Sequence, residues 1–145
     1  MKKQAILVSA CLLGVCCRYD GESKPDAKVI KLREKYVLIP ICPEVDGGLP
    51  TPRTPSERVG DKVLMRDGTD VTQNYRSGAE MALERARSFN CSIAIMKARS
   101  PSCGKGVIYD GSFSGSLTER DGVAAELLSE NGITVFTEDE IDNLL

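Results

Sequence analysis

The chain has 145 residues, of which 41% are hydrophobic and 28% are charged, and its net charge is −2. This size and composition are typical of one soluble domain, here residues 1–145, and the near-neutral charge argues against a general DNA-binding protein. Cysteines interrupt the apolar N-terminal run, and Arg18 and Asp20 follow it, so we expect no signal peptide. No stretch is long and apolar enough for a membrane span, and we therefore predict a cytoplasmic protein.

Short apolar runs predict four buried strands, over residues 5–10, 37–41, 92–96 and 133–136. Helical periodicity predicts helices over 25–35, 72–89 and 118–130, the last capped by Thr118, and a short helix beginning at Thr137. Residues 62–69 suggest a small hairpin, whereas the breaker-rich segments 42–58 and 98–115 are predicted to be irregular and without helix. The order predicts an α/β fold: a Rossmann-like three-layer sandwich with a mostly parallel sheet of about four strands, plus a small hairpin insertion.

The chain contains six cysteines and no histidine. In a cytosolic domain large enough to have its own core, metal binding or catalysis is a better first hypothesis than a disulfide framework. The absence of histidine excludes Cys/His catalytic pairs and zinc sites that need imidazole. Cys91 begins a predicted strand at the opposite sheet edge, and we expect it to be simply buried.

Three other cysteines occupy equivalent places. Cys11 follows the first predicted strand, Cys42 follows the second, and Cys103 lies a few residues after the third. The carboxyl ends of parallel strands share one edge of the sheet, where ligands of open α/β sheets bind. Any one of these cysteines could be a small buried hydrophobe, but their common placement favours a shared site at this edge.

Thiolates are suitable ligands for zinc or for an iron–sulfur cluster. A fourth thiol from Cys16 or Cys17 would close a structural zinc site, although the sequence contains no CxxC pair. Three cysteines alone would leave one metal open to substrate, as in a [4Fe–4S] cluster with one iron not held by protein. A redox pair of Cys16 and Cys17 is disfavoured, because adjacent cysteines are geometrically awkward partners.

Polar residues close to these cysteines are candidates for the remaining chemistry. Glu44 lies two residues after Cys42 and could act as a general acid or base, or be a solvated surface carboxylate. Ser100 and Ser102 belong to the loop of Cys103 and could bind a substrate or position water. Further candidates, with structural loop bracing as the alternative, are Arg18, Tyr19, Asp20 and Arg53.

Four blocks carry a family resemblance: VSACLLGVCCRYDG (8–21), CPEVDGGLPTPRTPSE (42–57), DVTQNY (70–75) and KARSPSCGKGVIYDG (97–111). They cover nearly the whole chain and resemble the thiouracil desulfidases, a bacterial and archaeal family formerly catalogued as a domain of unknown function. The resemblance implies a non-redox reaction in which water replaces the sulfur of a thiolated uracil, giving uracil and hydrogen sulfide.

The resemblance also implies a [4Fe–4S] cluster whose fourth iron, not held by protein, takes the substrate sulfur. Its ligands would be Cys11, Cys42 and Cys103, with Cys17 as an alternative ligand, and Glu44 and Ser100 match residues beside the substrate. The other hypothesis is a non-enzymatic zinc, iron–sulfur or sulfur-handling module in which a fourth cysteine closes the site. Neither the thiolated ring position, nor the choice between free base, nucleoside and tRNA, nor the oligomeric state follows from the sequence.

Overall fold

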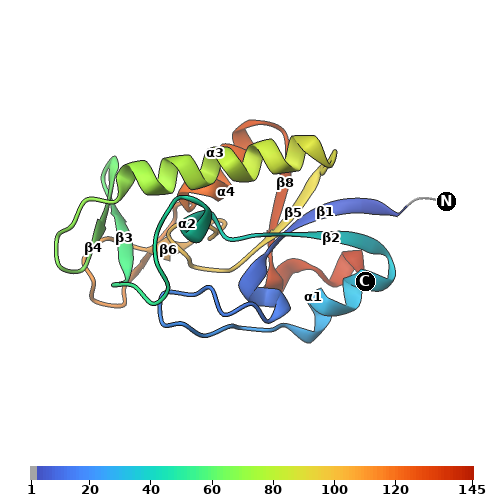
Figure 1. Ribbon diagram of the computed structural model, residues 1–145, viewed down its shortest axis with the longest axis horizontal. Helices are drawn as coiled ribbons and strands as arrows, with labels where there is room; N and C mark the ends of the chain where they lie inside the picture. Colours follow the sequence, from blue (N-terminus) through green and yellow to red (C-terminus); the bar gives the residue numbers. More distant parts are fainter. Residues whose placement is uncertain (1–2) are drawn as a thin grey trace.

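A computed structural model of the protein describes residues 3–145, and its centre is a four-stranded parallel sheet (Figure 1). The strands are β1 (Gln4–Ser9), β2 (Tyr36–Ile41), β5 (Ile93–Met96) and β8 (Thr134–Thr137). Their order is β2-β1-β5-β8, and every neighbouring pair is parallel. All four predicted strands are therefore confirmed, each to within one residue at either end.

Helices cover both faces of this sheet (Figure 1). One face carries α3 (Thr72–Ser88) and α4 (Val123–Glu130), whose small and aliphatic side chains pack on the sheet in one core cluster. The other face carries α1 (Ala27–Lys31), the 3-10 turn η2 (Leu32–Glu34) and the C-terminal turns η3 (Glu138–Glu140) and η4 (Asp142–Leu144). This is the predicted three-layer α/β fold. No helix within residues 3–145 has the length and apolar character needed to cross a membrane.

Two predicted helix starts differ from the structure. Asp26 caps α1, because its side chain accepts a hydrogen bond from the Val29 amide. The prediction that Thr118 caps the helix expected over 118–130 was wrong: Thr118 belongs to strand β7 (Leu117–Thr118), which pairs with β6 (Ile108–Tyr109). At the C-terminus Thr137 does form a capping box, but the segment it caps is a 3-10 turn.

The segments predicted to be irregular contain short elements. Pro43–Asp46 forms the one-turn helix α2, against the expectation that this segment holds no helix. The physical reason is that proline is favourable at the first position of a helix, where no amide donor is needed. Strand β3 (Ser56–Val59) pairs with β4 (Lys62–Met65), so the predicted hairpin exists and also includes residues from the breaker-rich segment.

Helix α2 packs against α3 so closely that two contact positions, Gly47 and Gly78, have no room for a Cβ atom. A Cβ at Gly78 of α3 would lie 1.8 Å from the Pro43 carbonyl oxygen, and one at Gly47 would lie 2.0 Å from the Asn74 carbonyl oxygen. The side-chain amide of Asn74 also donates a hydrogen bond of 2.9 Å to the Gly47 carbonyl. These contacts fix the turn that directly follows Cys42, so α3 positions the residues of α2.

We expect Gly78→Ala to destabilise the protein, although alanine is intrinsically better in a helix by about 1 kcal/mol. The new methyl group would clash with backbone, and overpacking of this kind costs about 1–3 kcal/mol. Thermal denaturation compared with Ser77→Ala, an exposed neighbour on the same helix, tests this. A Gly78→Ala protein more stable than wild type would show that α2 is free to move.

Candidate functional site

The order in which the chain adds strands to the sheet changes side between β1 and β5. From β1 it proceeds to β2 on one side and then crosses to β5 on the other, which makes the carboxyl ends of β1 and β5 a switch point. A cavity of about 460 Å³ lies there and is lined by residues that follow β1, β2 and β5. The structure thus brings together, in one cavity, the loops that the sequence analysis selected.

All three predicted ligand cysteines line this cavity. Cys11 is buried in the 3-10 turn η1 (Ala10–Leu13) directly after β1, and Cys42 is the N-cap residue of α2 after β2. Cys103 is buried in the loop after β5. Cys17, the alternative ligand, also lines the cavity, whereas Cys16 is exposed. Four cysteines therefore share one site.

Within this group, Cys17 lies closest to Cys11 and Cys42. Its thiol is close enough to those of Cys11 and Cys42 for both to shift its pKa, and the Cys42 thiol donates to the Cys17 carbonyl oxygen at 3.7 Å. The hydrogen bond to Cys11 is the largest cause that raises the pKa of the Cys17 thiol to about 11. The pKa of Cys42 is also raised, first by its hydrogen bond with Cys17 and then by burial.

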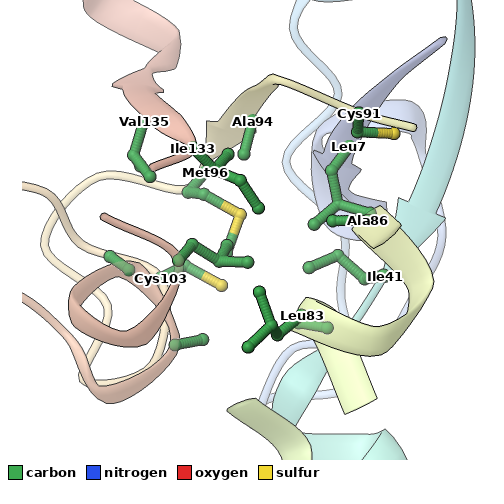
Figure 2. Packing of buried hydrophobic residues seen from close by; sticks show 14 of the residues in the cluster. Leu7, Ile41, Leu83, Ala86, Cys91, Ala94, Met96, Cys103, Ile133 and Val135 are labelled. Atoms are coloured by element: carbon green, nitrogen blue, oxygen red, sulfur yellow. The ribbon is translucent and has the colours of Figure 1, made fainter. Parts of the chain in front are cut away.

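Cys103 approaches the site from the other side of the sheet. Its side chain belongs to the core cluster beside Met96, and Figure 2 shows it at the end of that cluster away from Cys91. Burial raises the pKa of the Cys103 thiol to about 12. Cys91 is buried, as predicted, and it does not line the cavity.

The donor set suits a group that binds thiolates. Thiols with raised pKa stay protonated in this environment, and a metal centre would displace their protons on binding. No three His, Cys, Asp or Glu side chains of residues 3–145 converge on a point as the ligands of one ion would. The ligands of a cluster bind different iron atoms and need not converge in this way.

Basic side chains outnumber acidic ones in the lining of the cavity, and their positive charge offsets the negative charge of bound thiolates. The basic residues are Arg18, Lys24, Arg53, Arg66, Lys97 and Arg99, and the acidic residues are Glu44 and Glu57.

Glu44 lies in the first turn of α2 and its carboxylate is held on both oxygens. Arg53 Nε donates to one oxygen at 3.1 Å, and Ser102 Oγ donates to the other at 3.0 Å. The Arg53 side chain is 3% exposed and that of Glu44 is 15% exposed, so this is a buried ion pair. Arg53 also donates to the Cys17 carbonyl at 2.9 Å, which ties the loop after β1 to α2.

Ser100 organises the loop that carries Cys103. Its hydroxyl oxygen accepts hydrogen bonds from the amides of Ser102 at 3.2 Å and Cys103 at 3.1 Å. The hydroxyls of Ser100 and Ser102 lie 3.0 Å apart. Because a charged acceptor forms the stronger bond, the Ser102 proton is directed to Glu44, and Ser100 then donates to Ser102. The three side chains form a hydroxyl chain that ends on the carboxylate.

The loop is seated on the first turn of α4. The Ser102 carbonyl accepts from the amides of Ala124 and Ala125, and the Pro101 carbonyl accepts from that of Val123. A Cβ at Gly122 would lie 2.6 Å from the Ser102 carbonyl carbon, so glycine is needed for this approach. The fourth helix starts at Val123 because the loop of Cys103 docks there, which sequence periodicity could not reveal.

The other candidates divide between the site and its rim. Arg18 and Tyr19 line the cavity and form a cation–π pair at 5.7 Å, while Asp20 pairs with Arg18 at 3.5 Å and braces the loop. The sequence analysis did not single out Lys97, which lines the cavity and forms an ion pair of 2.8 Å with Glu138. Lys97 directly follows the predicted strand over 92–96, and this position could have indicated that it belongs to the site.

The fold and the site together define an α/β protein with a thiol-lined cavity and a buried carboxylate at the switch point of a parallel sheet. Residues 6–140 match the family described as 2-thiouracil desulfurase, so the chain belongs to that family of enzymes. It is 41% identical to YbbK of Bacillus subtilis (strain 168) over 97% of this chain and 99% of that protein. It is also similar to the solved structure of a [4Fe-4S]-dependent thiouracil desulfidase, TudS (DUF523Vcz). The identity is 43% and the TM-score 0.90, over 98% of this chain and 95% of that one.

Proposed function

We propose that the protein removes sulfur from a thiolated uracil by hydrolysis, giving uracil and hydrogen sulfide, with a [4Fe–4S] cluster as cofactor. The observation that carries the proposal is the single cavity that holds three strand-end cysteines and the carboxylate of Glu44. Family membership and the similarity to a [4Fe-4S]-dependent thiouracil desulfidase support it.

Cys11, Cys42 and Cys103 would hold the cluster, each from the loop after a different strand. Cys17 remains the alternative ligand, since its thiol lies beside those of Cys11 and Cys42. When bound, the cluster supplies a Lewis acid at the iron without a protein ligand, which polarises the thiocarbonyl group.

Glu44 and Ser100 act on protons and on substrate orientation. Glu44 accepts the proton of the attacking water, or delivers a proton to a ring nitrogen. The hydroxyls of Ser100 and Ser102 reach Glu44 in a chain of 3.0 Å steps, so a proton can pass along them to the carboxylate. Arg53 fixes the orientation of the carboxylate through its hydrogen bond of 3.1 Å.

The decisive experiment is anaerobic reconstitution followed by assay of iron, acid-labile sulfide and turnover. We expect about four iron and about four sulfide per chain, and sulfide release from 2-thiouracil, 4-thiouracil or both. Iron content without release from either base would contradict the proposed reaction.

The alternative of a non-enzymatic zinc module closed by Cys17 is disfavoured, because no three His, Cys, Asp or Glu side chains of residues 3–145 converge on one point and the family is one of enzymes. In such a module four thiolates would close the site. Zinc retained in the absence of iron, without sulfide release, would support this alternative against the desulfidase.

A further inference from the structure

One buried polar group has no role in the network described above. Tyr75, in the first turns of α3, is 1% exposed, and its ring packs in a small cluster with Leu49, Val63 and Val71. Its hydroxyl is buried and has no hydrogen-bond partner among the residues that the structure describes. Such groups are rare in folded proteins because an unpartnered buried donor is destabilising, so a retained one calls for a reason.

Tyr75 lies on α3 between Asn74, which donates to the Gly47 carbonyl at 2.9 Å, and Gly78, which packs against the Pro43 carbonyl. It therefore stands beside the turn that carries Glu44, and the nearby polar groups that act on its pKa are the carboxylate of Glu44 and the hydroxyl of Ser56, two residues of the cavity wall. Burial, and then the charge of Glu44, raise the pKa of Tyr75 well above its ordinary value, so the phenol stays protonated and is a hydrogen-bond donor. Tyr75 itself does not line the cavity and stands behind Glu44.

The carboxylate of Glu44 has capacity for this donor. A carboxylate offers about four acceptor sites, and Arg53 and Ser102 occupy two of them. Ser102 lines the cavity, so its hydroxyl is the partner that substrate or water would recruit. The hydroxyl of Tyr75 is out of reach of solvent and is the donor that remains on the inner side.

We propose that Tyr75 is a positioning residue for Glu44, supporting the carboxylate from the inner side of the cavity wall when the Ser102 hydroxyl turns to substrate. This inference rests on the proposed function of Glu44. It also gives a role to the block DVTQNY, whose residues the proposed chemistry does not otherwise use. Asp70 accepts from the Thr72 amide at 2.9 Å at the start of α3, Asn74 holds the end of α2, and Tyr75 stands behind Glu44.

The test is Tyr75→Phe, which removes only the hydroxyl. We expect kcat for thiouracil to fall by about tenfold or more, with KM and iron content unchanged, since a misplaced catalytic group lowers the rate of the chemical step. The melting temperature should stay the same or rise, because an unpartnered hydroxyl has been removed. Tyr36→Phe, which removes a hydroxyl at the far end of β2, is the matched control. An unchanged kcat for Tyr75→Phe would overturn the proposal.

A double-mutant cycle tests the contact without any turnover. The melting temperatures of the reconstituted Ser102→Ala, Tyr75→Phe and double variants should be non-additive, because loss of the Ser102 hydroxyl leaves a Glu44 oxygen free to accept from Tyr75. Additive changes would overturn the contact between Tyr75 and Glu44. If the wild-type protein releases no sulfide from either thiouracil, the proposed reaction fails alone and the cycle still decides the contact.

Discussion

Replacement of Cys42 by alanine is expected to abolish both iron–sulfur binding and sulfide release. Cys42 lines the cavity as the N-cap of α2, and its thiol lies beside that of Cys17. Removal of one of three ligands leaves a second iron atom without a protein ligand. The measurement is iron and sulfide content after anaerobic reconstitution, together with sulfide release. We expect the same loss for Cys11→Ala and Cys103→Ala.

Two cysteines provide matched controls in the same chain. Cys91 is buried at the opposite end of the core, and Cys16 is exposed, so alanine at either position should leave iron content and turnover unchanged. Cys17→Ala tests the alternative ligand. Retained iron in this variant, with loss in the alanine variants of Cys11, Cys42 and Cys103, supports the proposed set. Loss of iron in Cys17→Ala, with retention in one of the other three variants, would put Cys17 in place of that cysteine.

Replacement of Glu44 by glutamine is expected to keep the cluster and to lower kcat by about 100-fold or more, the range typical for loss of a general acid or base. Glutamine is preferred to alanine for a physical reason. Arg53 is 3% exposed, and an unpaired buried charge costs about 3–5 kcal/mol. Glutamine keeps a hydrogen-bond acceptor near Arg53, so the loss of activity can be assigned to the carboxylate.

Glu126→Gln is the matched control for this substitution. Glu126 also pairs with an arginine, Arg58, at 3.1 Å, but it does not line the cavity of the cysteines. We expect its kcat to match wild type. If Glu44→Gln retains full activity with either thiouracil, Glu44 has no catalytic role and the proton must be handled by another group.

The predictions that succeeded depend on local patterns. Apolar runs of four to six residues identified the strands, because a strand buried on both faces has little room for polar side chains. Once the strands are parallel, their carboxyl ends share an edge, and this placed Cys11, Cys42 and Cys103 in one cavity. The position of Glu44 near Cys42 follows from the same reasoning, since it lies only two residues further along the chain.

The hydrogen bonds of the site could not be predicted in this way. Ser102 and Glu44 are 58 positions apart in sequence, and their contact of 3.0 Å depends on how two loops pack at the sheet edge. The same is true of Gly78, whose need for glycine comes from the Pro43 carbonyl of another helix. Tyr75 has no sequence signal that sets it apart from other aromatic residues of a helix, and only the structure shows that its hydroxyl is buried without a partner among the described residues.

The sequence by itself therefore determined the α/β class, the strands and the group of cysteines at their ends, because these depend on hydrophobic pattern and chain direction. Only the tertiary structure decided the start of α4, the one-turn helix of Pro43–Asp46 and the network around Glu44. The start of α4 and the network around Glu44 arise from contacts between segments far apart in the chain, and such contacts leave no periodic signal in the sequence. Helix α2 instead begins at Pro43, a local start signal that the many prolines and glycines of the segment concealed.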